Sequence, residues 1–240
     1  TTEIYTLSLH DALPIYIHLY AASYDGQGAI AMRAGKDYTK LTGESFYEVL
    51  TLIRFGRFAE VREVTNRPKP EIQGGLWDFA QGYSHLKQGD VDFAALYLAR
   101  VKRAAETSTA GFRVHTAKDL LTIAAGILEG EIQRTAGDLS GAVASFQRAA
   151  DIQEALVYDE PEPLPFSAFH WLGAALLESR RFDEAEKAYR AELKDHPHNG
   201  WSLLGLQQAL EGKGIRSPDV DADLAASWSR ADTWIRSSRF

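Results

Sequence analysis

The stretch FSAFHWLGAALLESRRFDEAEKAYRAELKDHP, Phe166–Pro197, decides the fold. Apolar residues recur at three- and four-residue spacing on both sides of a short polar break at Arg180 and Arg181. Such spacing places the apolar side chains on one face of a helix, and the break marks a tight turn between two helices. Prolines lie only at the edges of the stretch, where a helix boundary tolerates them. The stretch therefore predicts one helix–turn–helix hairpin.

The same pattern recurs along the chain as a helix-like apolar stretch, a glycine or small turn, an apolar residue and a small residue. The copies are RFGRFAEV (54–61), KQGDVDFA (87–94), TAGDLSGA (135–142) and ESRRFDEA (178–185), with weaker ones at 24–31 and 211–220. Their turn positions are 26, 56, 89, 137, 180 and 214, separated by 30, 33, 48, 43 and 34 residues. A base period of 33–34 residues with two insertions is typical of stacked helical hairpins.

The residues around each turn suit this unit. Gly56, Gly89 and Gly137 supply a backbone conformation that other residues resist. Asp90 and Asp138 stand where an N-cap would accept hydrogen bonds from the next helix. Small residues then let two helices approach, and an aromatic four positions later fills the space between hairpins; these residues are Ala94, Ala142, Ala185, Phe146 and Tyr189.

The chain is accordingly predicted to be all-α, an α-solenoid of about six helix–turn–helix hairpins with no sheet. The expected helices cover 16–25, 28–38, 42–55, 57–66, 72–88, 90–106, 113–136, 138–158, 165–180, 182–195, 200–213 and 218–237. Trp228 and Trp234 are expected to cap the last apolar face of the solenoid from within the final helix.

The segment 166–197 resembles the tetratricopeptide repeat. The motif residues are Phe169, Leu172 and Gly173 in the first helix, Ala185 and Tyr189 in the second, and Pro197 at the end; Glu192 stands where the family prefers alanine. Longer stretches at 18–27, 157–168 and 196–210 are similar to long bacterial tetratricopeptide-repeat proteins of unassigned activity. The resemblance covers 16–240, with the clearest repeats at 123–156, 166–199 and 200–237, and implies the C-terminal part of a longer protein.

The first fifteen residues, TTEIYTLSLHDALPI, resemble a translated sequencing adapter. We interpret 1–15 as an artefactual segment fused to the repeat region and exclude it from the fold prediction. Its removal takes away Glu3 and Asp11, which changes the formal net charge from −7 to −5.

Composition excludes several classes of function. The 240 residues contain no cysteine, which rules out disulfides, thiolate metal sites and a cysteine nucleophile, and favours the cytoplasm. The negative net charge argues against nucleic-acid binding. The longest apolar stretch, near 120–128, is too short for membrane insertion.

Three short motifs could carry chemistry, and each has a plainer interpretation. The sequence GQGAIA (26–31) matches a dinucleotide fingerprint but lacks alternating strands and helices, so it is interpreted as a repeat turn. His196 and His198 could bind a metal, but a solvated turn is favoured. Glu160 and Glu162 could act as acid and base or belong to a connector. No catalytic residue, cofactor or metal site is predicted.

The resemblance implies a concave groove lined by the first helix of each hairpin. By the geometry of the family the groove residues are Phe79, Tyr83, Lys87, Glu131, Arg134, His170, Glu178, Trp201 and Gln208. The loop 158–165 is expected to lie over a groove edge and to influence ligand choice through Tyr158, Asp159, Glu160 and Glu162. Whether the groove residues bind a partner or pack between hairpins stays open.

The predicted function is a non-enzymatic scaffold that binds a partner protein, as a peptide or a helix, in this groove; self-association stays open. The alternative is a metal-dependent or enzymatic protein whose site requires repeats that precede this chain. Under the scaffold hypothesis, the double substitution Tyr83→Ala and Trp201→Ala should abolish partner capture while helicity is retained.

Overall fold

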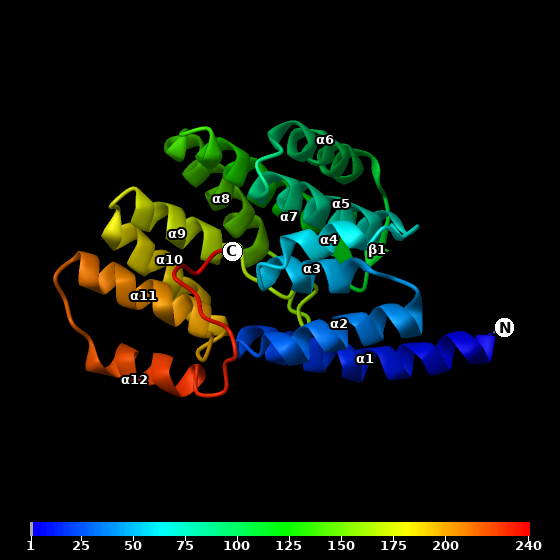
Figure 1. The fold of residues 1–240 in the computed structure, drawn as a ribbon, viewed down its shortest axis with the longest axis horizontal. Helices are drawn as coiled ribbons and strands as arrows, with labels where there is room; N and C mark the ends of the chain where they lie inside the picture. Colours follow the sequence, from blue (N-terminus) through cyan, green and yellow to red (C-terminus); the bar gives the residue numbers. More distant parts are fainter. Residues whose placement is uncertain (1) are drawn as a thin grey trace.

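The computed structural model describes residues 2–240, with side chains described from Ala12 onward. It is mostly helical, and the described part contains twelve helices (Figure 1). The helices are α1 (Thr2–Tyr24), α2 (Gly28–Thr42), α3 (Phe46–Arg54), α4 (Phe58–Glu63), α5 (Glu71–Lys87), α6 (Val91–Thr107), α7 (Ala117–Thr135), α8 (Leu139–Glu154), α9 (Phe169–Glu178), α10 (Phe182–Asp195), α11 (Gly200–Gly212) and α12 (Pro218–Ser227). The all-α prediction is therefore confirmed at this level. Helix α1 begins well before the predicted residue 16, and the predicted segment 1–15 falls mostly on residues whose side chains are outside the described part.

All six predicted turn positions have left-handed backbone. The φ angles are +69° at Gly26, +69° at Gly56, +85° at Gly89, +87° at Gly137, +57° at Arg180 and +74° at Gly214. The two predicted caps are also present, because Asp90 accepts from the backbone N–H of Phe93 and Asp138 from that of Gly141. Each turn joins two consecutive helices that pack against each other.

Glycines inside the helices allow large rings to lie against the neighbouring backbone. The Tyr189 ring lies between Gly173 of α9 and Gly205 of α11, where a Cβ at either glycine would collide with it. Phe146 of α8 occupies the same kind of space against Gly130 of α7. This confirms that Tyr189 fills the space between two hairpins, whereas the Phe146 contact lies inside the α7–α8 hairpin. Both contacts explain why the helices carry glycine there despite its low helix propensity.

The prediction of no sheet is wrong at one place. Gly111–Phe112 (β1) and His115–Thr116 (β2) form a two-stranded antiparallel hairpin between α6 and α7. Arg113 has a φ of +55°, which suits the two-residue turn that joins such short strands. The predicted helix at 113–136 consequently begins only at Ala117, where Thr116 caps it.

The prediction of a helix over 218–237 is also wrong, because α12 ends at Ser227. The residues that follow turn away from α12 and run into the middle of the molecule (Figure 1), where Phe240 packs against Tyr83 of α5, Trp171 of α9 and Trp201 of α11. Trp228 packs against Gly200 and the Trp201 ring, whereas Trp234 is 97% exposed. After Ser227, tertiary contacts with the rest of the chain take the place of helical hydrogen bonds.

No helix within residues 2–240 combines the length and the apolar character that a membrane crossing requires.

Candidate functional site

The nine predicted groove residues lie on α5, α7, α9 and α11. Five of them are buried, namely Phe79, Tyr83, Glu131, His170 and Trp201. Lys87, Arg134 and Gln208 are half-buried, and Glu178 is exposed. Most of them contact one segment of the same chain, residues 229–240. We call these residues the groove segment.

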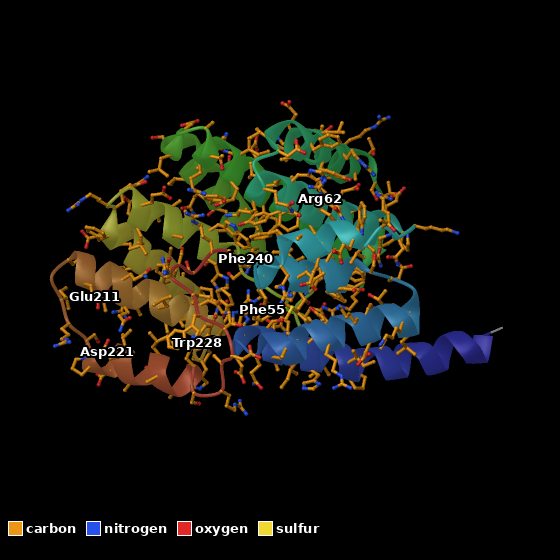
Figure 2. All side chains as sticks on the ribbon, in the orientation of Figure 1. Phe55, Arg62, Glu211, Asp221, Trp228 and Phe240 are labelled. Carbon is orange, nitrogen blue, oxygen red and sulfur yellow. The ribbon has the colours of Figure 1, made fainter. Side chains whose placement is uncertain are left out.

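Phe240 is the aromatic anchor of the groove segment. Its ring centroid lies 4.6 Å from that of Trp171, 5.9 Å from Tyr83 and 6.1 Å from Trp201. The Tyr83 hydroxyl donates to the Phe240 carbonyl and accepts from the Trp171 indole N–H at 3.0 Å. Figure 2 shows Phe240 in the middle of the molecule and Trp228 at the end of α12, directly before the groove segment.

A buried carboxylate binds the cation next to this anchor. Glu131 is 0% exposed, and its oxygens lie 3.2 Å from Arg239 of the groove segment, 2.9 Å from Lys87 and 3.3 Å from Arg134. Burial by itself raises the pKa of Glu131, but the three cations outweigh it and hold the pKa below its usual value. Arg239 also reaches Glu178 at 3.4 Å.

Polar contacts fix the backbone of the groove segment. The Ser238 hydroxyl lies 2.7 Å from the Tyr189 hydroxyl and donates to the His170 carbonyl. The Gln208 amide donates to the Arg236 carbonyl at 3.0 Å. Together with the anchors at Arg239 and Phe240, these bonds connect the end of the segment to α7, α9, α10 and α11.

The start of the groove segment closes over the first hairpin. Asp232 accepts hydrogen bonds from the backbone N–H groups of Gly28 and Ala29 at the start of α2, at 2.6 and 3.0 Å. Helix N-termini favour such negative charge. The apparent dinucleotide fingerprint thus follows a helix, and the N–H groups of its residues Gly28 and Ala29 are bound by a carboxylate of the same chain.

The loop 158–165 lies between α1, α3, the β-hairpin and α10. Asp159 forms ion pairs with Arg113 at 2.6 Å and with His115 at 3.2 Å. The loop backbone accepts hydrogen bonds from the Tyr16 and Tyr47 hydroxyls, at the Glu162 and Pro163 carbonyls. Tyr158 and Glu160 are exposed. The loop forms one wall of a cavity of about 600 Å³ that also contacts α1 and α10.

His196 lies on the inner wall of this cavity. Its Nδ1 is 2.9 Å from Glu192, its Nε2 is 3.5 Å from Glu162, and the same Nε2 is 3.0 Å from the Tyr20 hydroxyl. The interpretation of the His196–His198 motif as a solvated turn is therefore wrong for His196, because the first hairpin covers it, and holds for His198, which is exposed. Among the described residues, no group of three His, Asp or Glu side chains is placed to hold a metal ion.

A second buried polar cluster lies behind His196. The Arg54 guanidinium lies over the rings of Tyr24, at 4.9 Å, and Trp201, at 4.5 Å, and its Nε donates to the Ser23 carbonyl. Burial lowers the pKa of Arg54 to about 10. Asn199 links the remaining members by donating to Glu192 at 2.7 Å and to His170 Nε2 at 2.8 Å.

We expect the pKa values of His170 and His196 to be shifted in opposite directions from that of free histidine. Burial, reinforced by the positive charges of Arg54 and His196, lowers the pKa of His170 well below its usual value. Burial also lowers the pKa of His196, but Glu192 and Glu162 outweigh it and raise the pKa above its usual value. A ¹H–¹³C NMR titration should find His196 protonated above the pH at which free histidine titrates and His170 still neutral below it.

These two pKa shifts should also determine how the free energy of unfolding depends on pH. Below about pH 6.5 the unfolded chain protonates His170 but the native state does not, so this residue lowers the free energy of unfolding by up to about 1.4 kcal/mol per pH unit as the pH falls. His196 contributes stability that is present below about pH 6.5 and is lost as the pH rises through its raised pKa. His170→Gln should flatten the acid decline, and His196→Gln should remove the gain in stability that His196 provides as the pH falls through its raised pKa to about 6.5. Equal pH profiles for both variants would contradict this assignment.

Several members of these clusters carry no motif signal in the sequence. Arg54, Ser238, Arg239 and Phe240 were not selected, since each lies outside the motif positions of the repeat. Asn199 carried a usable signal, because it precedes a predicted helix and caps it by accepting from the Trp201 N–H.

A scan against protein-family models and a search of curated proteins both find no match to this chain.

Proposed function

We propose that the chain is a helical-repeat scaffold of the tetratricopeptide type that binds an extended peptide in its concave groove. The observation that carries the proposal is the groove segment itself. Its last residues contact Tyr83, Glu131, Glu178 and Gln208, four of the residues selected as groove residues from sequence. A segment of the same chain thus occupies the position in which a partner peptide would lie.

The contacts indicate the chemistry of the peptide. An aromatic residue would insert between Trp171 and Tyr83, as Phe240 does. A cationic residue before it would meet the buried Glu131 and the exposed Glu178, and the buried charge-assisted pair with Glu131 would discriminate between partners. The proposed ligand class is therefore an extended segment with an arginine or lysine followed by an aromatic residue.

A peptide added in trans tests the proposal. The labelled peptide SRADTWIRSSRF, residues 229–240, is titrated into the full chain and into a full chain with Arg239→Ala and Phe240→Ala. The tethered segment competes at an effective concentration in the millimolar range, so weakening it should expose the groove. We expect the double variant to bind the peptide at least about tenfold more tightly than the unmodified chain, measured by fluorescence anisotropy.

The matched control is the same peptide with both substitutions. It lacks the guanidinium and the ring, and it should bind the variant chain at least about tenfold more weakly than the native peptide. If both peptides bind the variant chain alike, the groove does not recognise this chemistry and the proposal fails.

A further inference from the structure

The cavity beside the loop 158–165 is separate from the contacts of the groove segment. Its volume of about 600 Å³ lies within the usual range for a small-molecule site. The lining comes from α1, β2, the end of α8, the loop and α10, with Tyr20 and Phe169 as aromatic walls. Helices distant in sequence therefore enclose a space large enough for a small molecule.

The lining carries an excess of negative charge. Its carboxylates are Glu154, Asp159, Glu160, Glu162, Glu192 and Asp195. Lys194 is the one lysine or arginine among the lining residues, and Arg113 neutralises Asp159 from beside the cavity. His196 lies between Glu162 and Glu192 and compensates only part of their charge. Such a wall favours a cationic ligand.

One carboxylate has unused bonding capacity. Glu192 lines the cavity and is 2% exposed. Its Oε1 accepts from Asn199 and lies beside His196, whereas its Oε2 has no hydrogen-bond partner in the structure. A buried carboxylate oxygen without a donor is costly, so a ligand N–H group at this position would relieve that cost.

We propose that this cavity binds a small aliphatic polyamine, with its ammonium groups at lining carboxylates that include Glu162 and Glu192 and the alkyl chain against Tyr20 and Phe169. The carboxylates are spread along the cavity from α8 to α10, which suits several separate positive charges. Aromatic walls add a cation–π contribution for the same ligand class. A single metal ion suits the site less well, because the described residues include no three-ligand group.

Isothermal titration of the full chain with spermidine at about 0.15 M salt tests the site, because surface charges are screened at that ionic strength. We expect saturable one-to-one binding that falls at least tenfold in Glu162→Gln and in Glu192→Gln. Glu162 is half-buried, so Glu162→Gln decides the outcome if Glu192→Gln disrupts folding, which circular dichroism reports. Glu211→Gln, an exposed carboxylate outside the cavity, is the matched control and should bind as the unmodified chain does.

Several outcomes would overturn the proposal. These are an absence of saturable binding, an equal loss in Glu211→Gln, or magnesium chloride at equal concentration displacing spermidine completely. Because the groove segment does not line the cavity, the chain with Arg239→Ala and Phe240→Ala should bind spermidine unchanged. Failure of the peptide experiment would therefore leave this result intact, and the reverse also holds.

Discussion

Replacing Trp201 with alanine should lower the free energy of unfolding by about 3–5 kcal/mol, measured by urea denaturation of the full chain. The ring is 1% exposed and packs edge-on against Trp228 and Phe55. Its indole N–H donates to the Ser23 carbonyl, and its face supports the Arg54 guanidinium. Alanine would leave a cavity, remove one of the two donors to the Ser23 carbonyl and take away the ring that supports the buried Arg54 guanidinium.

The control is Trp234→Ala, which makes the same chemical change at a side chain that is 97% exposed. We expect this variant to differ from the unmodified chain by at most about 0.5 kcal/mol. Similar losses in both variants would show that Trp201 is not part of a packed core. The expectation that Tyr83→Ala with Trp201→Ala retains helicity is therefore revised, because both residues are buried and their loss should destabilise the whole fold.

Replacing Glu131 with glutamine should cost about 3–5 kcal/mol of unfolding free energy. Glutamine keeps the size of the side chain but removes the charge that balances Lys87, Arg134 and Arg239. The three cations would then repel one another at a site that water reaches poorly. The groove segment should also loosen, which faster hydrogen exchange at its backbone amides near Ser238 would report.

Glu178→Gln is the matched control for this cluster. Glu178 contacts Arg134 and Arg239 at 3.5 and 3.4 Å, but its side chain is exposed. Solvent-exposed ion pairs contribute about 0–1 kcal/mol, so the control should lose no more than that. A Glu131→Gln variant that unfolds at the same urea concentration as Glu178→Gln would contradict the buried ion cluster.

Local sequence signals predicted the helices and the turns well. Left-handed backbone favours glycine, and five of the six predicted turns carry it, so their positions could be read directly. The apolar spacing predicted the twelve helices, although several ends shifted. The helix expected at 113–136 begins later because Gly111 pairs with Thr116 and Phe112 with His115, a local hairpin that the apolar periodicity does not reveal.

The candidate sites were predicted only in part. The resemblance selected Tyr83, Glu131 and Gln208, because the geometry of the family predicts which repeat positions face a groove, and all three contact the segment 229–240. It did not select Arg239 or Phe240, because both belong to the segment that follows α12 and has no repeat pattern. The cavity was missed because it needs Tyr20 and His196, which are 176 residues apart, to meet.

The sequence alone therefore determined the helical hairpins, since caps, left-handed turns and apolar faces depend on neighbours within a few residues. The tertiary structure was needed to show what the segment 229–240 contacts and what lines the cavity. Side chains such as Phe240 and Arg239 find their partners through contacts across more than a hundred residues, with Tyr83 and Glu131. Such contacts depend on the path of the whole chain, which no local period encodes.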